Sequence, residues 1–107
     1  MTFPDDVPDL LIKKPKQLEE LESMDRVFLD SMLPTEVQEK VEEIAHAVAA
    51  AYQQQKKNGN YDECKETVAV ALSVTGSAIG GHVGNALIAA SESAAKRSCS
   101  AIYPPEY

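Results

Sequence analysis

Apolar side chains recur along this chain at intervals of three and four residues, which is the period of an amphipathic α-helix. The clearest run follows Thr35 and consists of Val37, Val41, Ile44, Val48 and Tyr52. Thr35 and Gln38 match a capping box before this run, and Asn58-Gly59 matches a left-handed helix end after it. We therefore expect a helix of about 22 residues, close to 33 Å long.

A preceding helix is predicted from about Pro15 to Met32. Pro15 suits the first helical position, where a missing N–H loses no hydrogen bond. Pro34 is expected to end this helix. The positions on its inward face have the same spacing: Leu18, Leu21, Met24 (or Asp25), Phe28 and Leu29. Residues 1–14, with two prolines and three aspartates, are expected to form an extended N-terminal arm.

A third helical pattern begins after Asn60, which forms a second capping box with Glu63. Its apolar stripe keeps one phase through Cys64, Val68, Leu72, Gly76, Ile79, Val83, Leu87, Ala90 and Ala94. Gly76, Gly80 and Gly84 recur every fourth residue and place bare backbone on one face, beside Val83 and Leu87. Such a face allows close approach of another helix, either inside the bundle or from a second copy of the chain.

Residues 60–99 fit two arrangements, of which one is a continuous helix about 58 Å long. The other is a hairpin that bends at Gly80-Gly81, and we favour it because two adjacent interior glycines cost a helix about 2 kcal/mol. The cysteines distinguish the two. A hairpin makes Cys64 and Cys99 neighbours that could form a disulfide, whereas a straight helix separates them by about 52 Å and forbids the bond.

These patterns predict an all-α fold, namely a small antiparallel bundle of three or four helices. The abundance of alanine favours helix over strand. A chain of 107 residues has the length of one domain. We expect the bundle over residues 15–100 and a C-terminal tail over 101–107.

Charge is distributed unevenly along the chain, which has a net charge of −7. Residues 17–43 hold nine acidic and two basic residues, whereas acids and bases balance elsewhere. Direct nucleic-acid binding is not expected, because it needs clustered lysines and arginines. The acidic stretch either contacts a basic protein partner or is a solvated helix face. The candidate contact residues are Glu19, Glu22, Asp25, Glu36, Glu39 and Glu43.

Candidate catalytic chemistry is sparse. Glu43-x-x-His46 has the spacing of one half of a di-iron carboxylate site, but a complete site needs two such pairs, so only a dimer could build it. The alternative is a surface histidine beside Glu42 and Glu43. Cys64 lies near a helix start, yet its acidic neighbours oppose a reactive thiolate. We therefore expect no catalytic residue, metal or cofactor, and no enzyme.

Two short peptides near the ends have known resemblances. Pro104-Pro105-Glu106-Tyr107 is similar to the P-P-x-Y peptide that WW domains bind in an extended conformation. Residues 6–11, Asp-Val-Pro-Asp-Leu-Leu, are similar to an acidic dileucine sorting signal. The alternatives are a frayed tail and an arm that docks on the bundle.

The function most consistent with these features is a non-enzymatic protein-binding module, such as an inhibitor, an immunity protein or an adaptor. A self-associating assembly component, paired as a homodimer through the glycine face, and an adaptor presenting the C-terminal P-P-x-Y peptide are the alternatives. Residues 1–14 lack the features of a secretory signal, and no stretch has the roughly 20 apolar residues of a membrane span. A soluble protein is therefore expected, with the cytoplasm as its location and a secreted or periplasmic location as the alternative.

Overall fold

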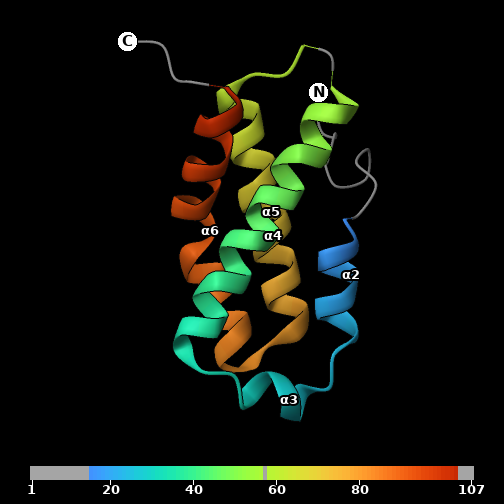
Figure 1. Ribbon diagram of the computed structural model, residues 1–107, viewed down its shortest axis with the longest axis vertical. Helices are drawn as coiled ribbons and strands as arrows, with labels where there is room; N and C mark the ends of the chain where they lie inside the picture. The colour runs from blue at the N-terminus through green and yellow to red at the C-terminus, as the bar shows by residue number, and fades with distance from the viewer. Residues whose placement is uncertain (1–14, 57, 104–107) are drawn as a thin grey trace.

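The computed structural model describes residues 15–56 and 58–103, and over these residues the protein is an all-α bundle without strands (Figure 1). This confirms the fold class. The expected N-terminal arm and most of the expected C-terminal tail lie outside the described residues. The helices are α2 (Lys16–Ser23), α3 (Arg26–Asp30), α4 (Pro34–Gln55), α5 (Tyr61–Ile79) and α6 (Gly81–Ile102).

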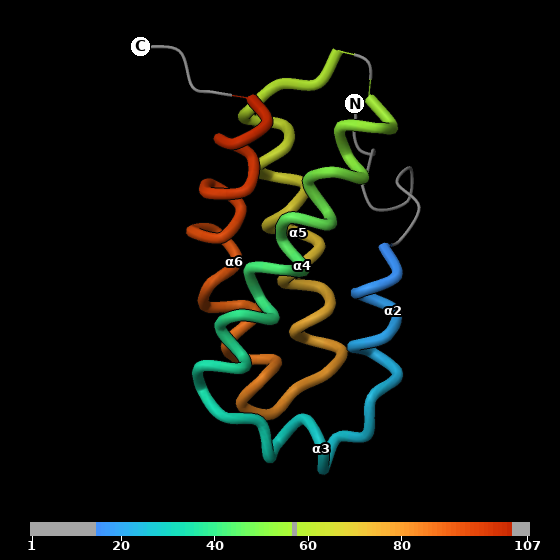
Figure 2. The backbone as a smooth tube through the Cα atoms, in the orientation of Figure 1, coloured from blue at the N-terminus to red at the C-terminus, as the bar shows by residue number. Residues whose placement is uncertain are grey.

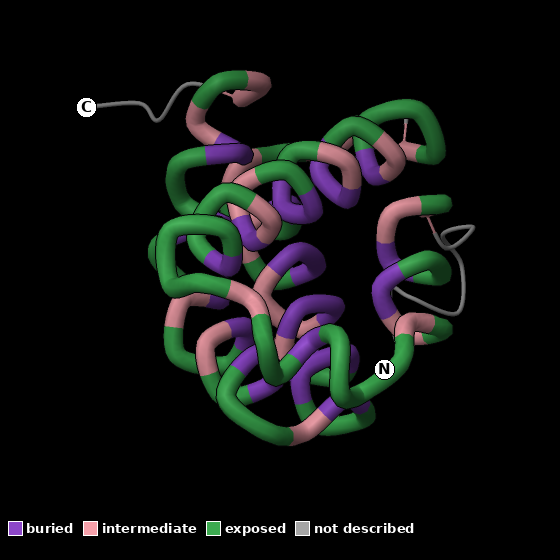
Figure 3. The backbone as a smooth tube through the Cα atoms, turned by 60° about the horizontal axis from the view of Figure 1, so that its bottom comes forward, coloured by how far each residue is buried: buried purple, intermediate pink, exposed green. Residues whose placement is uncertain are grey.

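The three long helices form the body of the bundle and run antiparallel in sequence order (Figure 2). α5 packs most extensively against α6, and α4 lies across both. The short helix α2 packs against α4 and α5, while α3 lies at one end of the bundle near the turn between α5 and α6. Buried residues line the inward faces of these helices (Figure 3).

Residues 60–99 adopt the hairpin rather than the continuous helix. Gly80 and Gly81 both have positive φ angles, +70° and +66°, which side-chain-bearing residues rarely adopt. Their left-handed backbone reverses the chain between α5 and α6. Gly80 therefore belongs to the turn, which corrects the expectation that it shares a packing face with Gly76 and Gly84.

Gly76 and Gly84 face each other across the hairpin. A Cβ atom on Gly76 would lie 2.6 Å from the carbonyl oxygen of Gly84, which is closer than real Cβ contacts come. Both glycines are buried, together with Val83 and Leu87. The expected close approach of two helices therefore occurs within the chain, and these residues are not exposed to a second copy.

Cys64 and Cys99 are joined by a disulfide at the open end of the hairpin, with their Cα atoms 5.8 Å apart. Both are fully buried. The bond connects the first turn of α5 to the last turns of α6, so the hairpin is closed by glycines at one end and by a covalent bond at the other.

The predicted first helix is in fact two helices, because the helical backbone is interrupted at Met24 and Asp25. Met24 has an extended backbone, and the side chain of Asp25 accepts a hydrogen bond from the Val27 N–H at 2.8 Å. An aspartate that caps a new helix in this way competes with continuation of the preceding one. The break turns α3 across the end of the bundle.

Pro34 is the first residue of α4, whereas the preceding helix α3 already ends at Asp30. Its missing N–H suits the first helical position. The carboxylate of Glu36 accepts the N–H of Leu33 at 2.8 Å, and Thr35 is already helical. The predicted capping box at Thr35 and Gln38 is therefore wrong, because the helix starts two residues earlier and is capped by a different side chain.

The connection between α4 and α5 also departs from expectation. Lys56 is extended after α4, and Gly59 does not have a positive φ, so Asn58-Gly59 does not form the predicted left-handed end. Gly59 instead leaves room for two tyrosines, since a Cβ there would lie 2.6 Å from the Tyr103 hydroxyl oxygen. The cap at Asn60 is confirmed, because its side chain accepts the N–H of Glu63 at 2.8 Å. The other half of the predicted box is not found, because the Glu63 carboxylate accepts the Tyr52 hydroxyl instead.

Candidate functional site

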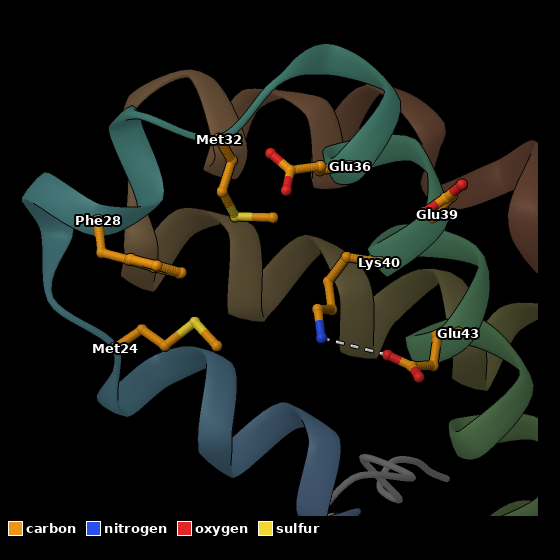
Figure 4. Close-up of a pocket in the computed structure, with 7 residues that line it drawn as sticks. All are labelled: Met24, Phe28, Met32, Glu36, Glu39, Lys40 and Glu43. Carbon is orange, nitrogen blue, oxygen red and sulfur yellow. Dashed lines mark hydrogen bonds and ion pairs between the residues drawn. The ribbon is translucent and has the colours of Figure 1, made fainter.

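A groove of about 400 Å³ opens between the α2–α3 segment and the first half of α4 (Figure 4). One side of it is apolar and the other is charged. The lining residues are Met24, Phe28, Met32, Glu36, Glu39, Lys40 and Glu43.

The apolar side is a consequence of the break between α2 and α3. Because α3 is short and lies across the end of the bundle, it buries only Leu29. Phe28 remains 56% exposed, and its neighbour Val27 is 76% exposed. Leu33, just before α4, is 61% exposed. Large apolar side chains therefore project into solvent at the groove and around it, a feature that marks binding surfaces when it is clustered.

The charged side is one face of α4. Glu36, Lys40 and Glu43 follow the helical repeat, so they lie on one face beside the buried stripe of the same helix. The Lys40 ammonium lies 3.2 Å from a carboxylate oxygen of Glu43, while Glu36 caps the helix. Glu39 has no hydrogen bond or ion pair with any described residue. Three carboxylates against one ammonium leave this side acidic.

Half of the predicted acidic surface thus meets at the groove. Glu36, Glu39 and Glu43 line it, whereas Glu19 and Glu22 lie on α2 outside the lining, and Asp25 caps α3. The six acids therefore do not form one continuous site.

The sequence interpretation missed the apolar half of the groove. It placed Met24 and Phe28 in the core stripe of one long helix, whereas Phe28 is exposed and Met24 is only partly buried. The signal that could have revealed them is Asp25, a good N-cap residue inside the predicted helix.

The described part of the chain contains neither a cluster of metal ligands nor a free thiol. Glu43 is paired with Lys40, and Glu42 is paired with Arg97 rather than with His46. No group of three His, Cys, Asp or Glu side chains there is arranged to hold a metal ion. Cys64 has no free thiol, because its sulfur is bonded to Cys99.

Among the described residues, a buried tyrosine beside the disulfide is the one titratable group whose pKa is strongly shifted. The Tyr52 hydroxyl donates a hydrogen bond to the Glu63 carboxylate at 2.6 Å, and the Tyr103 ring packs edge-on with centroids 6.0 Å apart. Burial, and then the hydrogen bond to Glu63, raise the pKa of Tyr52 well above its ordinary value. The phenol is fully buried, so it supports packing between α4, α5 and α6 and is out of reach of a substrate.

A second groove of about 320 Å³ lies at the start of α5 and the middle of α6. It has no large apolar side chain that could anchor a partner. Its lining is Asp62, Lys65, Glu66, Ala69 and Glu92. The groove beside α3 is therefore the stronger candidate site.

Within residues 15–56 and 58–103, no helix combines the length and apolar character that a bilayer crossing requires. Comparison with known proteins adds no family. No protein-family model matches the chain, and no curated protein sequence or solved structure is significantly similar to it.

Proposed function

We propose that this protein is a non-enzymatic protein-binding module that holds a basic surface of its partner in the groove between α3 and α4. The observation that carries the proposal is that one groove is lined both by exposed Phe28, with Met24 and Met32, and by Glu36, Glu39 and Glu43. Inhibitor, immunity protein and adaptor are the roles that such a module serves.

The two sides of the groove supply different parts of recognition. Burial of exposed apolar surface provides binding free energy, about 25 cal/mol for each Å² removed from water. Methionine side chains are flexible and fit irregular partners. The carboxylates attract a basic partner over a distance and disfavour an acidic one, so they govern association rate and specificity.

The proposal is tested by capturing proteins from extracts of the source organism with three forms of the chain. One form is unchanged, one carries Glu39→Gln and Glu43→Gln, and a matched control carries Glu66→Gln and Glu92→Gln. Both variants lose two charges, but only the first loses them in the groove. We expect partners held by the unchanged chain and by the control to be released from the groove variant at lower salt.

The proposal is contradicted if all three forms retain the same proteins to the same salt concentration. Capture of a protein by the unchanged chain alone does not count as support. The difference between the two double variants is the decisive quantity, because it separates the groove from the overall charge of −7.

The disulfide bears on where the module acts. A cytoplasmic location was the expectation from sequence, but cytosolic thiols are kept reduced, and stable disulfides belong to oxidising compartments. We therefore propose that the protein works in an oxidising compartment. Alkylation of the denatured protein from its source, without prior reduction, tests this, because modification of Cys64 and Cys99 would show that the bond is absent in the cell.

A further inference from the structure

We propose that the segment bound in the groove is a basic amphipathic α-helix of the partner. One large apolar side chain of that helix enters between Met24, Phe28 and Met32, and its lysines or arginines face Glu39 and Glu43. This inference rests on the proposed function and specifies the partner's chemistry.

The spacing of the carboxylates on α4 suits a helical partner. Glu36 and Glu43 are seven residues apart, which is about two turns and about 10 Å along the helix axis. A helix lying alongside α4 presents its own side chains at the same repeat, so cations three, four or seven residues apart can face these acids in register. The Lys40 ammonium offsets part of the negative charge of the Glu43 carboxylate. Glu39 has no such ion pair with a described residue and can pair with a cation of the partner.

The apolar side of the groove suits a single large anchor. Its volume of about 400 Å³ is at the small end of binding-site volumes, and it is open to solvent. Met24 and Met32 are partly buried against the core, so they form a fixed bottom of the groove. Phe28 is exposed and forms its edge, where the ring can contact a partner. Amphipathic helices bind such grooves through one or a few apolar side chains on one face.

Other occupants fit less well. An extended strand needs a sheet edge for pairing, and the described residues form helices only. A second copy would bring its own net charge of −7 against an acidic groove. A nucleic acid or an anionic membrane surface would be repelled by the same carboxylates. A cationic helix is the occupant that both sides of the groove attract.

The chain offers a simple reporter, because two of its three methionines line the groove. The full chain is labelled with ¹³C at the methionine methyl groups and titrated with a synthetic 14-residue helix of leucines and lysines arranged on opposite faces. We expect saturable movement of the Met24 and Met32 signals, assigned by Met24→Leu and Met32→Leu.

Two controls make the result specific. A peptide with glutamate at every lysine position keeps the apolar face, and we expect it to bind at least tenfold more weakly. The variant with Glu39→Gln and Glu43→Gln should bind the lysine peptide about tenfold more weakly. The variant with Glu66→Gln and Glu92→Gln should bind it as the unchanged chain does.

Three results overturn the inference. These are no movement of the Met24 and Met32 signals, equal binding of both peptides, and movement that follows protein concentration without peptide, which would identify a second copy as the occupant. Failure here is distinct from failure of the proposed function. Partners that depend on Glu39 and Glu43 while the lysine helix does not bind would mean that the partner presents another structure.

Discussion

The α5–α6 hairpin and the α2–α3 segment are built in opposite ways. From Thr67 to Ser91 the hairpin contains no aspartate, glutamate, lysine or arginine, and it is closed by glycines at one end and a disulfide at the other. The α2–α3 segment consists of two short helices that bury only Leu18, Leu21 and Leu29. It is rich in acids and leaves large apolar side chains exposed.

The contrast separates stability from recognition within one small bundle. Close packing and a covalent bond make the hairpin a rigid support for α4. The α2–α3 segment has few buried contacts, which is typical of the parts of a protein that open most easily and that bind partners. The two regions meet beside the Gly80-Gly81 turn, where Oδ1 of Asp30 in α3 lies 3.6 Å from Nδ1 of His82 in α6. The α2–α3 segment therefore contacts the glycine end of the hairpin.

Removal of the disulfide should have the largest effect on stability. The bond links residues 35 apart in sequence, and closing a loop of that size contributes about 4 kcal/mol to the free energy of unfolding. We expect the double variant Cys64→Ala and Cys99→Ala to lose about that amount in chemical denaturation. A loss below about 1 kcal/mol would show that the hairpin is stable without its covalent closure.

Gly84→Ala should cost about 3 kcal/mol, because the new methyl group collides with the backbone of Gly76 and the two helices must move apart. The neighbouring exposed residue supplies the control, and Asn85→Ala should change the free energy of unfolding by less than about 0.5 kcal/mol. Thermal or chemical denaturation measures both. Equal effects at the two positions would contradict the close approach of α5 and α6.

Tyr52→Phe should cost about 1 kcal/mol at neutral pH, because the hydrogen bond to Glu63 is lost within a buried cluster. The raised pKa of Tyr52 adds a pH dependence. The folded chain keeps this proton at a pH where the unfolded chain releases it, so the contribution is constant below about pH 10 and is lost as the pH rises above it. Denaturation midpoints from pH 8 to 11 should fall less steeply in Tyr52→Phe; parallel curves would exclude Tyr52 as the cause.

Phe28→Ala should have the smallest effect, below about 1 kcal/mol, because most of the side chain is already in water. The adjacent buried residue is the matched control, and Leu29→Ala should cost at least about 2 kcal/mol. The same Phe28→Ala variant should weaken binding of the lysine helix described above. A strong loss of stability in Phe28→Ala would place this ring in the core and remove it from the groove's function.

Sequence reasoning succeeded where the local signal and the tertiary contact agree. The cap at Asn60, the buried stripe of α4 and the all-α fold were all predicted, because capping residues and helical periodicity act over a few residues. It failed at Asp25 and Thr35, where two local signals competed. Asp25 interrupts an apolar pattern that continues in phase through it, and Pro34 and Glu36 start α4 before Thr35 can.

The sequence by itself determined the all-α fold, the three long helical stripes, the uneven charge and a run of glycines that had to let another helix approach. Only the tertiary structure decided which helix they met, because the same missing side chains serve a neighbour in the chain or a second molecule equally well. The turn at Gly80 and Gly81 made that choice by reversing the chain, and it brought Cys64 and Cys99 together. The groove likewise depends on the direction in which α3 leaves α2, which periodicity along the chain does not encode.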